Sequence, residues 1–217
     1  MPGTRSSWPA GACYDRMIHI VDYRMGNLRS VQKAFERIGI PAKITAEPDE
    51  VMQAGKLILP GVGHFSRAMD ILQSAGLSDA LIQAVTVKKT PILGICLGMQ
   101  LLTNRSEEGD MPGLGLVDAE TIRFSNHSGL KIPHMGWNTL RPEKPSPLYN
   151  GLSEQDPFYF VHSYYVTCKD PRDRLFVTSY GNLFDAGFQK DHIAGVQFHP
   201  EKSHQPGLRL LKNFAAM

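Results

Sequence analysis

A cysteine placed between two glycines is the first feature of this chain that could do chemistry. The segment 94–98, Gly-Ile-Cys-Leu-Gly, follows a short apolar run and precedes a pattern of helical spacing. Small neighbours on both sides of a nucleophile are typical of a strained strand-to-helix turn. The amides and the dipole at a helix N-terminus favour the thiolate, which is the attacking form. We therefore interpret Cys96 as a reactive cysteine; an ordinary buried thiol is the alternative.

A histidine and a glutamate far downstream provide the partners that such a cysteine needs. His199, Pro200 and Glu201 follow another apolar run. A cysteine nucleophile needs an imidazole as its base, and the imidazole needs a carboxylate to fix its tautomer. Pro200 favours an extended His199, and residues two apart in an extended chain share one side. Singly these residues indicate only a loop histidine and a surface carboxylate, but with Cys96 they predict a Cys-His-Glu triad.

A glycine-rich turn supplies a candidate oxyanion hole. The segment 59–64, Leu-Pro-Gly-Val-Gly-His, ends the apolar run 56–59. Acyl transfer develops a negative oxygen, which is commonly bound by the amide after the nucleophile and by an amide from a separate strand-to-helix loop. Here these would be Leu97 and the Gly61–Val62 segment. An ordinary left-handed turn is the alternative, and the ending of a Walker phosphate loop is missing.

Composition restricts the classes of protein to consider. The 217 residues are 42% hydrophobic with a net charge of +2, which suits one globular domain and gives no basic footprint for nucleic acid or an anionic membrane. The three cysteines are widely spaced and the eight histidines are scattered, so we expect neither a disulfide framework nor a metal site. No apolar run reaches the roughly 20 residues of a membrane helix, and we expect a cytoplasmic protein.

Apolar runs alternate with helical patterns from residue 17 onward, whereas residues 1–16 are rich in Pro, Gly and Ser. We expect a disordered extension over 1–16 and a single domain over 17–217. The alternation predicts an α/β fold with an open, mixed, largely parallel sheet and helices on both faces, a flavodoxin-like three-layer arrangement. Antiparallel strands are expected in the second half. Strands are predicted over 18–23, 42–45, 56–59, 115–124, 138–141, 158–167, 175–180, 184–189 and 193–198, and helices over 28–38, 65–75, 77–88, 97–104 and 206–216.

Six motifs give the chain a resemblance to a known family. The sequence resembles the class I glutamine amidotransferases, and most closely their glutaminase subunits of imidazole glycerol phosphate synthase. One departure from the family pattern is Arg24, where these proteins usually have a small residue. The motifs are 22–28 (DYRMGNL), 59–63 (LPGVG), 94–100 (GICLGMQ), 133–138 (PHMGWN), 160–164 (FVHSY) and 197–203 (QFHPEKS).

The resemblance implies glutamine as the substrate and no cofactor. The Cys96 thiolate would attack the side-chain amide of glutamine, and His199 would protonate the departing ammonia. Gly63, Gln100 and Glu108 would seat the glutamine, with Glu108 at its α-amino group. A surface carboxylate is the alternative for Glu108.

The resemblance also implies a separate partner, a (β/α)₈-barrel cyclase subunit that receives the ammonia through a channel in histidine biosynthesis. Family members are weak glutaminases until the partner is loaded, so we expect a misformed oxyanion hole at Gly61–Val62 in the resting state. The alternatives are the glutaminase subunits of anthranilate or pyridoxal phosphate synthesis and a stand-alone cysteine hydrolase. The positions expected at the partner interface are Pro133, His134, Met135, Trp137, Asn138, Tyr159 and Lys202.

Overall fold

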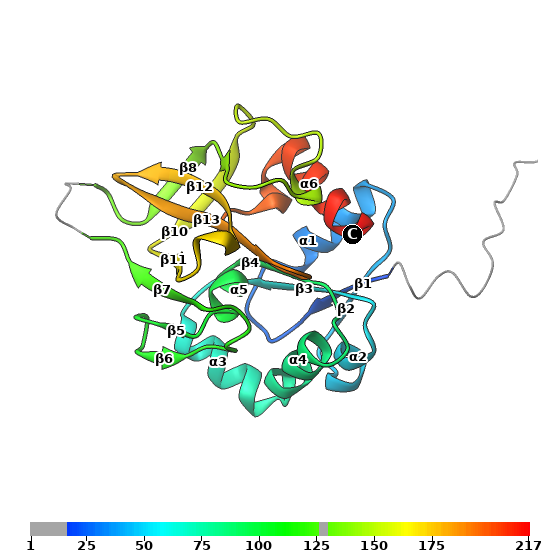
Figure 1. Ribbon diagram of the computed structural model, residues 1–217. Coiled ribbons are helices and arrows are strands. Elements are labelled where there is room, and N and C mark those ends of the chain that lie inside the picture. The colour runs from blue at the N-terminus through cyan, green and yellow to red at the C-terminus, as the bar shows by residue number, and fades with distance from the viewer. Residues whose placement is uncertain (1–16, 126–129) are drawn as a thin grey trace, which may run out of the picture.

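The computed structural model describes residues 17–125 and 130–217, and the extension expected over 1–16 lies outside them. A central sheet runs through the molecule, with helices above and below it (Figure 1). The apolar runs of the first half form the parallel strands, because strands covered on both faces are apolar throughout. The strands of the first half are β1 (Ile18–Val21), β2 (Ala42–Thr45), β3 (Lys56–Gly61), β4 (Ile92–Cys96), β5 (Arg105–Ser106), β6 (Met111–Pro112) and β7 (Ala119–Arg123).

The second half is built mostly from antiparallel strands, and it includes the long strands β12 and β13. Along the main sheet the order is β2-β1-β3-β4-β14-β13-β11-β7-β5-β6, and β12 pairs with β13 and β9. The pairs from β2 to β14 are parallel, and β13 pairs antiparallel with both β14 and β11. The strands are β8 (His134–Asn138), β9 (Arg141–Pro142), β10 (Phe158–His162), β11 (Tyr164–Cys168), β12 (Arg174–Tyr180), β13 (Asn182–Lys190) and β14 (Ile193–Val196).

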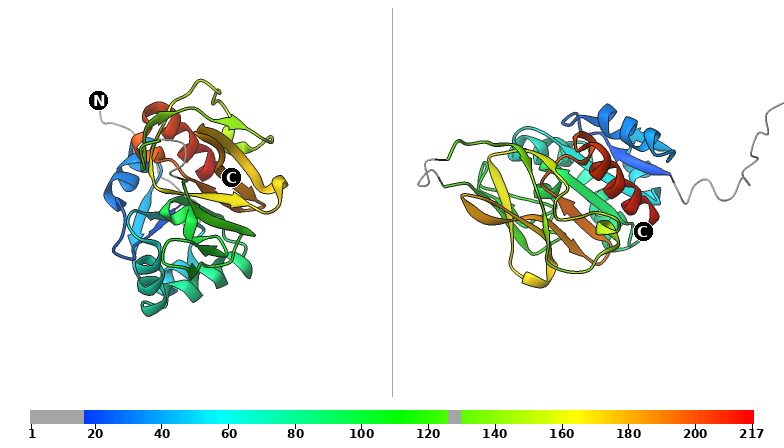
Figure 2. Two further views of the ribbon diagram at one scale, coloured as in Figure 1. Left: turned by 90° about the vertical axis from the view of Figure 1, so that its left-hand side faces the viewer. Right: turned by 90° about the horizontal axis from the view of Figure 1, so that it is seen from above.

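Helices cover both faces of the sheet, as the sequence predicted. Figures 1 and 2 show α1 and α6 together on one face, with α2, α3 and α4 on the other. Each face has its own apolar core, one including Phe35 and Phe214 and the other including Phe65 and Leu81. The helices are α1 (Leu28–Arg37), α2 (Pro48–Gln53), α3 (Phe65–Ser74), α4 (Leu77–Thr86), α5 (Leu97–Leu101) and α6 (His204–Ala216), with 3₁₀ turns η3 (Pro147–Tyr149), η4 (Pro171–Asp173) and η5 (Pro200–Lys202).

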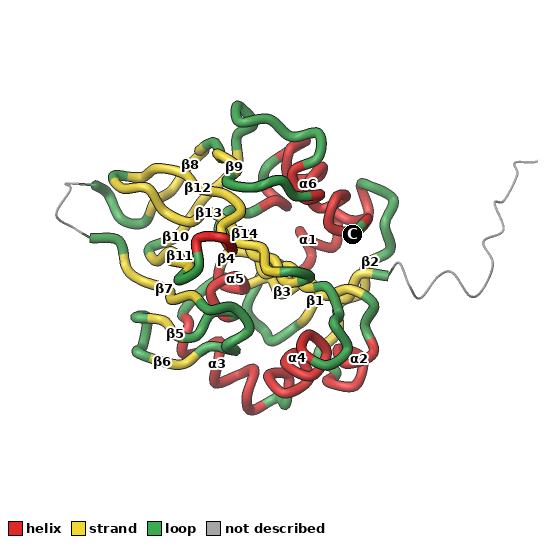
Figure 3. Tube along the Cα trace, viewed as in Figure 1, coloured by secondary structure: helices red, strands yellow, loops and turns green. Residues whose placement is uncertain are grey.

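Several predicted boundaries are wrong for identifiable reasons. The strand predicted over 158–167 is two strands, because the chain leaves the two-stranded β8–β10 sheet at Ser163 and joins the main sheet as β11. The strand predicted over 138–141 is displaced, since β8 ends at Asn138. The strand predicted over 115–124 shrinks to β7, and helix α2 was not predicted. Figure 3 shows that strands dominate the second half of the chain, whereas most helices belong to the first half.

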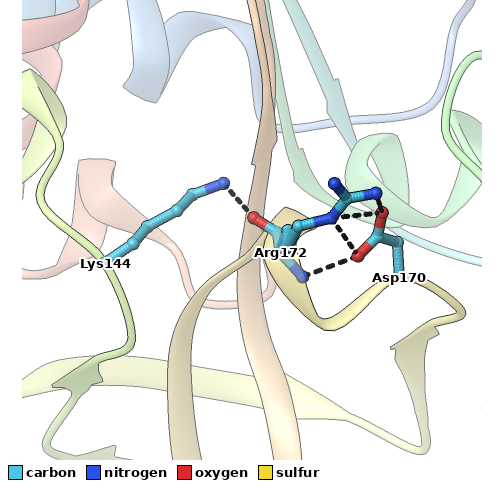
Figure 4. Close-up of polar contacts among 3 residues, drawn as sticks. All are labelled: Lys144, Asp170 and Arg172. Atoms are coloured by element: carbon cyan, nitrogen blue, oxygen red, sulfur yellow. Dashed lines mark hydrogen bonds and ion pairs between the residues drawn. The ribbon is translucent and has the colours of Figure 1, made fainter.

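A lysine and an ion pair hold the outer edge of the strand-rich half together (Figure 4). The Arg172 guanidinium contacts the Asp170 carboxylate at 2.6 Å, and these hydrogen bonds lower the pKa of Asp170 to about 2. Asp170 also accepts a hydrogen bond from the Arg172 amide, which caps η4. Lys144 donates to the Arg172 carbonyl at 2.6 Å and to the Gln189 carbonyl at 2.5 Å.

Candidate active site

Cys96 occupies a strained turn between β4 and α5. Its φ of 54° and ψ of −111° are rarely adopted by a residue with a side chain. The turn needs glycine on both sides, because a Cβ at Gly94 would meet Met99 backbone atoms at 2.7 Å and one at Gly98 would collide with the Leu59 carbonyl. The predicted strand, turn and helix are therefore present, and they hold the cysteine at the C-terminal edge of the sheet.

His199 and Glu201 form a buried pair. His199 Nδ1 lies 2.8 Å from Glu201 Oε1, and both side chains are 2% exposed. A carboxylate only accepts, so Nδ1 carries the hydrogen and Nε2 is left for the nucleophile. Burial by itself would lower the pKa of His199, but the Cys96 sulfur and the Glu201 carboxylate outweigh it and raise the pKa to about 10. Among the described residues Nε2 has no hydrogen-bond partner.

A cavity of about 290 Å³ opens beside the cysteine sulfur. Two groups contact the sulfur: the Val161 carbonyl at 3.9 Å and the Gln197 side-chain amide at 3.7 Å. The volume of the cavity lies near the lower end of the range for small-molecule sites. The lining residues are Val62, Gly63, Cys96, Leu97, Gln100, Glu108, Pro133, Val161, His162, Ser163 and Tyr164.

The residues predicted to form the oxyanion hole lie around this cavity. Val62 and Leu97 line it, and Gly61 is the register partner of Cys96 across the β3–β4 ladder. Val62 is 41% exposed although it directly follows the buried residues 57–61 of β3. Gly63 has a φ of 114°, a conformation that favours glycine.

The residues predicted to seat glutamine line the same cavity. Gln100 is 4% exposed, and its side-chain nitrogen donates to the Tyr164 carbonyl at 3.2 Å and to Gln197 Oε1 at 3.1 Å. One oxygen of Glu108 accepts from the Phe65 amide at 2.7 Å, at the start of α3. Glu108 is thus fixed by a helix N-terminus rather than lying loose on the surface.

Two residues predicted for the partner interface also have surroundings inside the domain. His134 is only 3% exposed, so its side chain is directed into the core rather than to a partner. Pro133 lines the cavity beside Cys96. The strand alternation explains the first difference, because neighbouring residues of β8 point to opposite faces. His134 therefore lies on the inner face of β8, while Met135 lies on its outer face.

The other predicted interface residues lie at or near the surface. Met135 is 62% exposed and Trp137 49% exposed, which is high for large apolar side chains. The Trp137 ring stacks on His204 at 5.1 Å, and the Lys202 ammonium lies 5.6 Å from the centre of the Tyr159 ring. Asn138 is partly exposed and donates to the Ser179 carbonyl.

Sequence reasoning missed one wall of the cavity. Val161, His162, Ser163 and Tyr164 form it, and they belong to the 160–164 motif that served only to recognise the family. Gln197 was also missed, although it begins the motif that contains His199. Two signals were available. Residues 161–164 lie within a motif that resembles the family, and Gln197 lies two residues before His199. In the described ranges 17–125 and 130–217, no cluster of potential metal ligands and no helix able to span a membrane is found.

The chain matches one family of known proteins. Residues 13–217 match the family model described as glutamine amidotransferase class-I. The chain belongs to that family.

Curated relatives narrow the family to one branch. A Pseudomonas aeruginosa protein named imidazole glycerol phosphate synthase subunit HisH 2 is 47% identical over 93% of this chain and 100% of its own. A Methanococcus maripaludis protein of the same name is 50% identical over 91% and 98%. The chain is thus a member of the group of imidazole glycerol phosphate synthase subunits.

Solved structures support the fold. A crystal structure titled glutamine amidotransferase aligns with a TM-score of 0.72 at 21% identity, over 92% of this chain and 99% of that one. The PurLQS structure from Thermotoga maritima aligns with a TM-score of 0.70 at 18% identity, over 92% and 97%.

Proposed function

We propose that Cys96, His199 and Glu201 hydrolyse glutamine in this chain, as the glutaminase subunit of imidazole glycerol phosphate synthase in histidine biosynthesis. One observation supports this proposal most: the buried His199–Glu201 pair, 2.8 Å apart, lies near enough to Cys96 for that sulfur to raise the pKa of His199, and Cys96 stands in a strained elbow beside a cavity. The two relatives described above are about half identical to this chain. Their names, imidazole glycerol phosphate synthase subunit HisH 2, indicate which amidotransferase this subunit belongs to.

The chemistry follows from the protonation states that the pair imposes. His199 takes the thiol proton on Nε2, and Glu201 stabilises the imidazolium through Nδ1. The Cys96 sulfur attacks the amide carbon of glutamine, and the tetrahedral intermediate expels ammonia after His199 protonates its nitrogen. A water molecule, deprotonated by His199, then cleaves the thioester and releases glutamate.

The oxyanion of the intermediate would be bound by the backbone amides of Leu97 and Val62. The Leu97 amide is at the N-terminus of α5, directly after the nucleophile. We also propose that the Gly61–Val62 segment is misformed at rest. A structure of the glutamine-free protein with both amides directed at the same point would contradict it.

The released ammonia must pass to a partner subunit without entering bulk water, because ammonia loses its nucleophilicity when water protonates it. The exposed Met135 and Trp137 on β8, together with Tyr159 and Lys202, offer an apolar surface with a cationic edge. We propose that a separate (β/α)₈-barrel cyclase subunit covers this surface and receives the ammonia.

A glutaminase assay tests the function. Wild type and Cys96→Ser would be compared with and without the barrel subunit and its nucleotide, and glutamate would be measured. Cys168→Ser is a matched control, because Cys168 is the other described free cysteine and is buried away from the cavity. We expect activity that needs Cys96 and rises with the loaded partner. Full activity without the partner would instead favour a stand-alone cysteine hydrolase.

A further inference from the structure

Two buried histidines connect the β8–β10 sheet to the wall of the cavity. His134 on β8 and His162 on β10 are register partners, and His134 Nδ1 lies 3.0 Å from His162 Nε2. Both rings are nearly inaccessible, at 3% and 6% exposed. Only His162 lines the cavity that holds Cys96. The proposed catalytic steps use neither ring.

The hydrogen bonds fix the tautomer of each ring. His162 Nδ1 lies 2.7 Å from the Tyr164 carbonyl, which can only accept, so Nδ1 carries the hydrogen. In a neutral ring, His162 Nε2 is then bare and must accept from His134 Nδ1–H. Burial lowers the pKa of both rings, to about 4 for His134 and about 3 for His162, so both are neutral at pH 7. The donors therefore run in one direction, from His134 to His162 to Tyr164.

This series of hydrogen bonds ends at Tyr164, in the wall of the cavity. The Tyr164 carbonyl receives hydrogen bonds from both His162 and Gln100, so both of its lone pairs are used. Three residues earlier, the Val161 carbonyl contacts the Cys96 sulfur. A carbonyl held from two sides cannot turn freely, so the segment 161–164 keeps one shape against the cavity.

Aromatic packing keeps the His134 ring in the orientation that this donor needs. The ring stacks on Tyr180 at 4.1 Å and on Phe160 at 4.9 Å, with Phe124 and Phe184 at its edges. An apolar side chain would fill this space without the cost of burying a polar ring. The use of histidine here thus indicates a need for its donor.

We propose that His134 is a positioning residue that acts through His162 to shape the glutamine-binding wall formed by residues 161–164. This inference rests on the proposed function for the identity of the ligand. It also gives His134, expected at the partner interface, a place one residue from the exposed Met135 and one hydrogen bond from the cavity.

Two substitutions at His134 separate the donor from the packing. His134→Asn places an amide N–H where Nδ1 stood but fills less space. His134→Leu fills more of the space but has no donor. If only packing mattered, the leucine variant would be the better of the two; the proposal requires the opposite order.

The test uses ¹⁵N-labelled full-length chain carrying Cys96→Ala, so that glutamine binds without turnover. Glutamine would be titrated and followed by NMR in this parent, in His134→Asn, in His134→Leu and in the control His192→Gln. His192 bonds the Val85 carbonyl at 2.8 Å, far from the cavity. We expect glutamine to bind His134→Leu about tenfold more weakly than the parent, the effect of one lost buried hydrogen bond, and His134→Asn to lie within about threefold.

The same samples report the tautomers directly. We expect a parent His162 ring protonated on Nδ1 only, with its signal assigned by its loss in His162→Gln. A ring protonated on Nε2, or equal binding by His134→Leu and the parent, would overturn the role of His134. A parent that fails to bind glutamine would contradict the proposed function itself, and with it this inference.

Discussion

Gly61 on β3 and Cys96 on β4 are register partners in adjacent parallel strands. The segment proposed to bind the oxyanion and the proposed nucleophile are therefore placed by one strand pairing. Parallel strands end at the same edge of a sheet, which is where open α/β folds bind ligands. The hydroxyl of the buried Tyr23 occupies the space into which a side chain at Gly61 would project.

The contact between Gly61 and Tyr23 leads to a first prediction. A Cβ at Gly61 would collide with the Tyr23 hydroxyl and meet Leu97 Cβ at 3.0 Å. Gly61→Ala should therefore lower kcat/KM for glutamine at least tenfold and destabilise the fold by about 1–3 kcal/mol. Tyr23→Phe removes the hydroxyl, which has no hydrogen-bond partner in the described structure, so that variant alone should be about as stable as wild type.

A double-mutant cycle checks the mechanism. Tyr23→Phe should recover part of the stability lost in Gly61→Ala, because the closest obstacle is gone. Urea unfolding of the four proteins measures the coupling. Strict additivity would mean that the collision with Tyr23 is not the cause.

The strained backbone of Cys96 leads to a second prediction. A positive φ with a side chain costs about 1–3 kcal/mol, and glycine avoids it. Cys96→Gly should abolish glutamine hydrolysis yet be about 1 kcal/mol more stable than Cys96→Ala. At Ala80, within α4, the change to glycine should instead cost about 1 kcal/mol. Denaturant midpoints of these variants give the comparison, and a less stable Cys96→Gly would argue against strain at the elbow.

His199 leads to a prediction about pH. Its pKa is raised from the ordinary 6.5 to about 10, so the folded state keeps a proton that the unfolded state loses. The resulting stability is fully present below pH 6.5 and is lost as the pH rises toward 10. Glu201→Gln removes one cause of the raised pKa, so its free energy of unfolding should fall less over this range. The exposed Glu36→Gln serves as a control and should follow wild type.

The left-handed backbone of Arg24 leads to a further prediction. Its φ is 64°, in the left-handed region that favours glycine. Arg24→Gly should therefore raise the free energy of unfolding by about 1 kcal/mol. Lys33→Gly, in the ordinary helix α1, should lower it by a similar amount. Equal losses at both positions would show that other contacts of the Arg24 side chain outweigh the backbone strain.

The first half of the fold was predictable because its signals are local. The apolar run at 56–59 became most of β3, since a strand buried on both faces needs apolar residues almost throughout. The strand predicted over 42–45 became β2, an edge strand that is only partly buried. Helix α2 was missed because its six residues are too few to show a helical period. Pro48 at its first turn and the acidic residues after it were its only signals.

The candidate site was predictable where one motif carries the chemistry, as at Cys96 and His199. The His134–His162 pair was not, because it depends on the register of two strands far apart in the sequence. Nothing local distinguishes a histidine directed inward on β8 from one directed outward. The same lack of local information hid the break at Ser163, where the chain changes sheets.

One further consequence concerns Tyr159, the second residue of β10. Its carbonyl accepts from the His199 amide at 2.9 Å, and its amide donates to Ser203 Oγ, which in turn donates to the His199 carbonyl. The ring of the same residue lies beside Trp137 and Lys202 on the outer surface. The backbone that holds His199 and the surface proposed to bind the cyclase subunit thus share Tyr159. A subunit bound to that surface would restrict the motion of the His199 imidazole without contacting it.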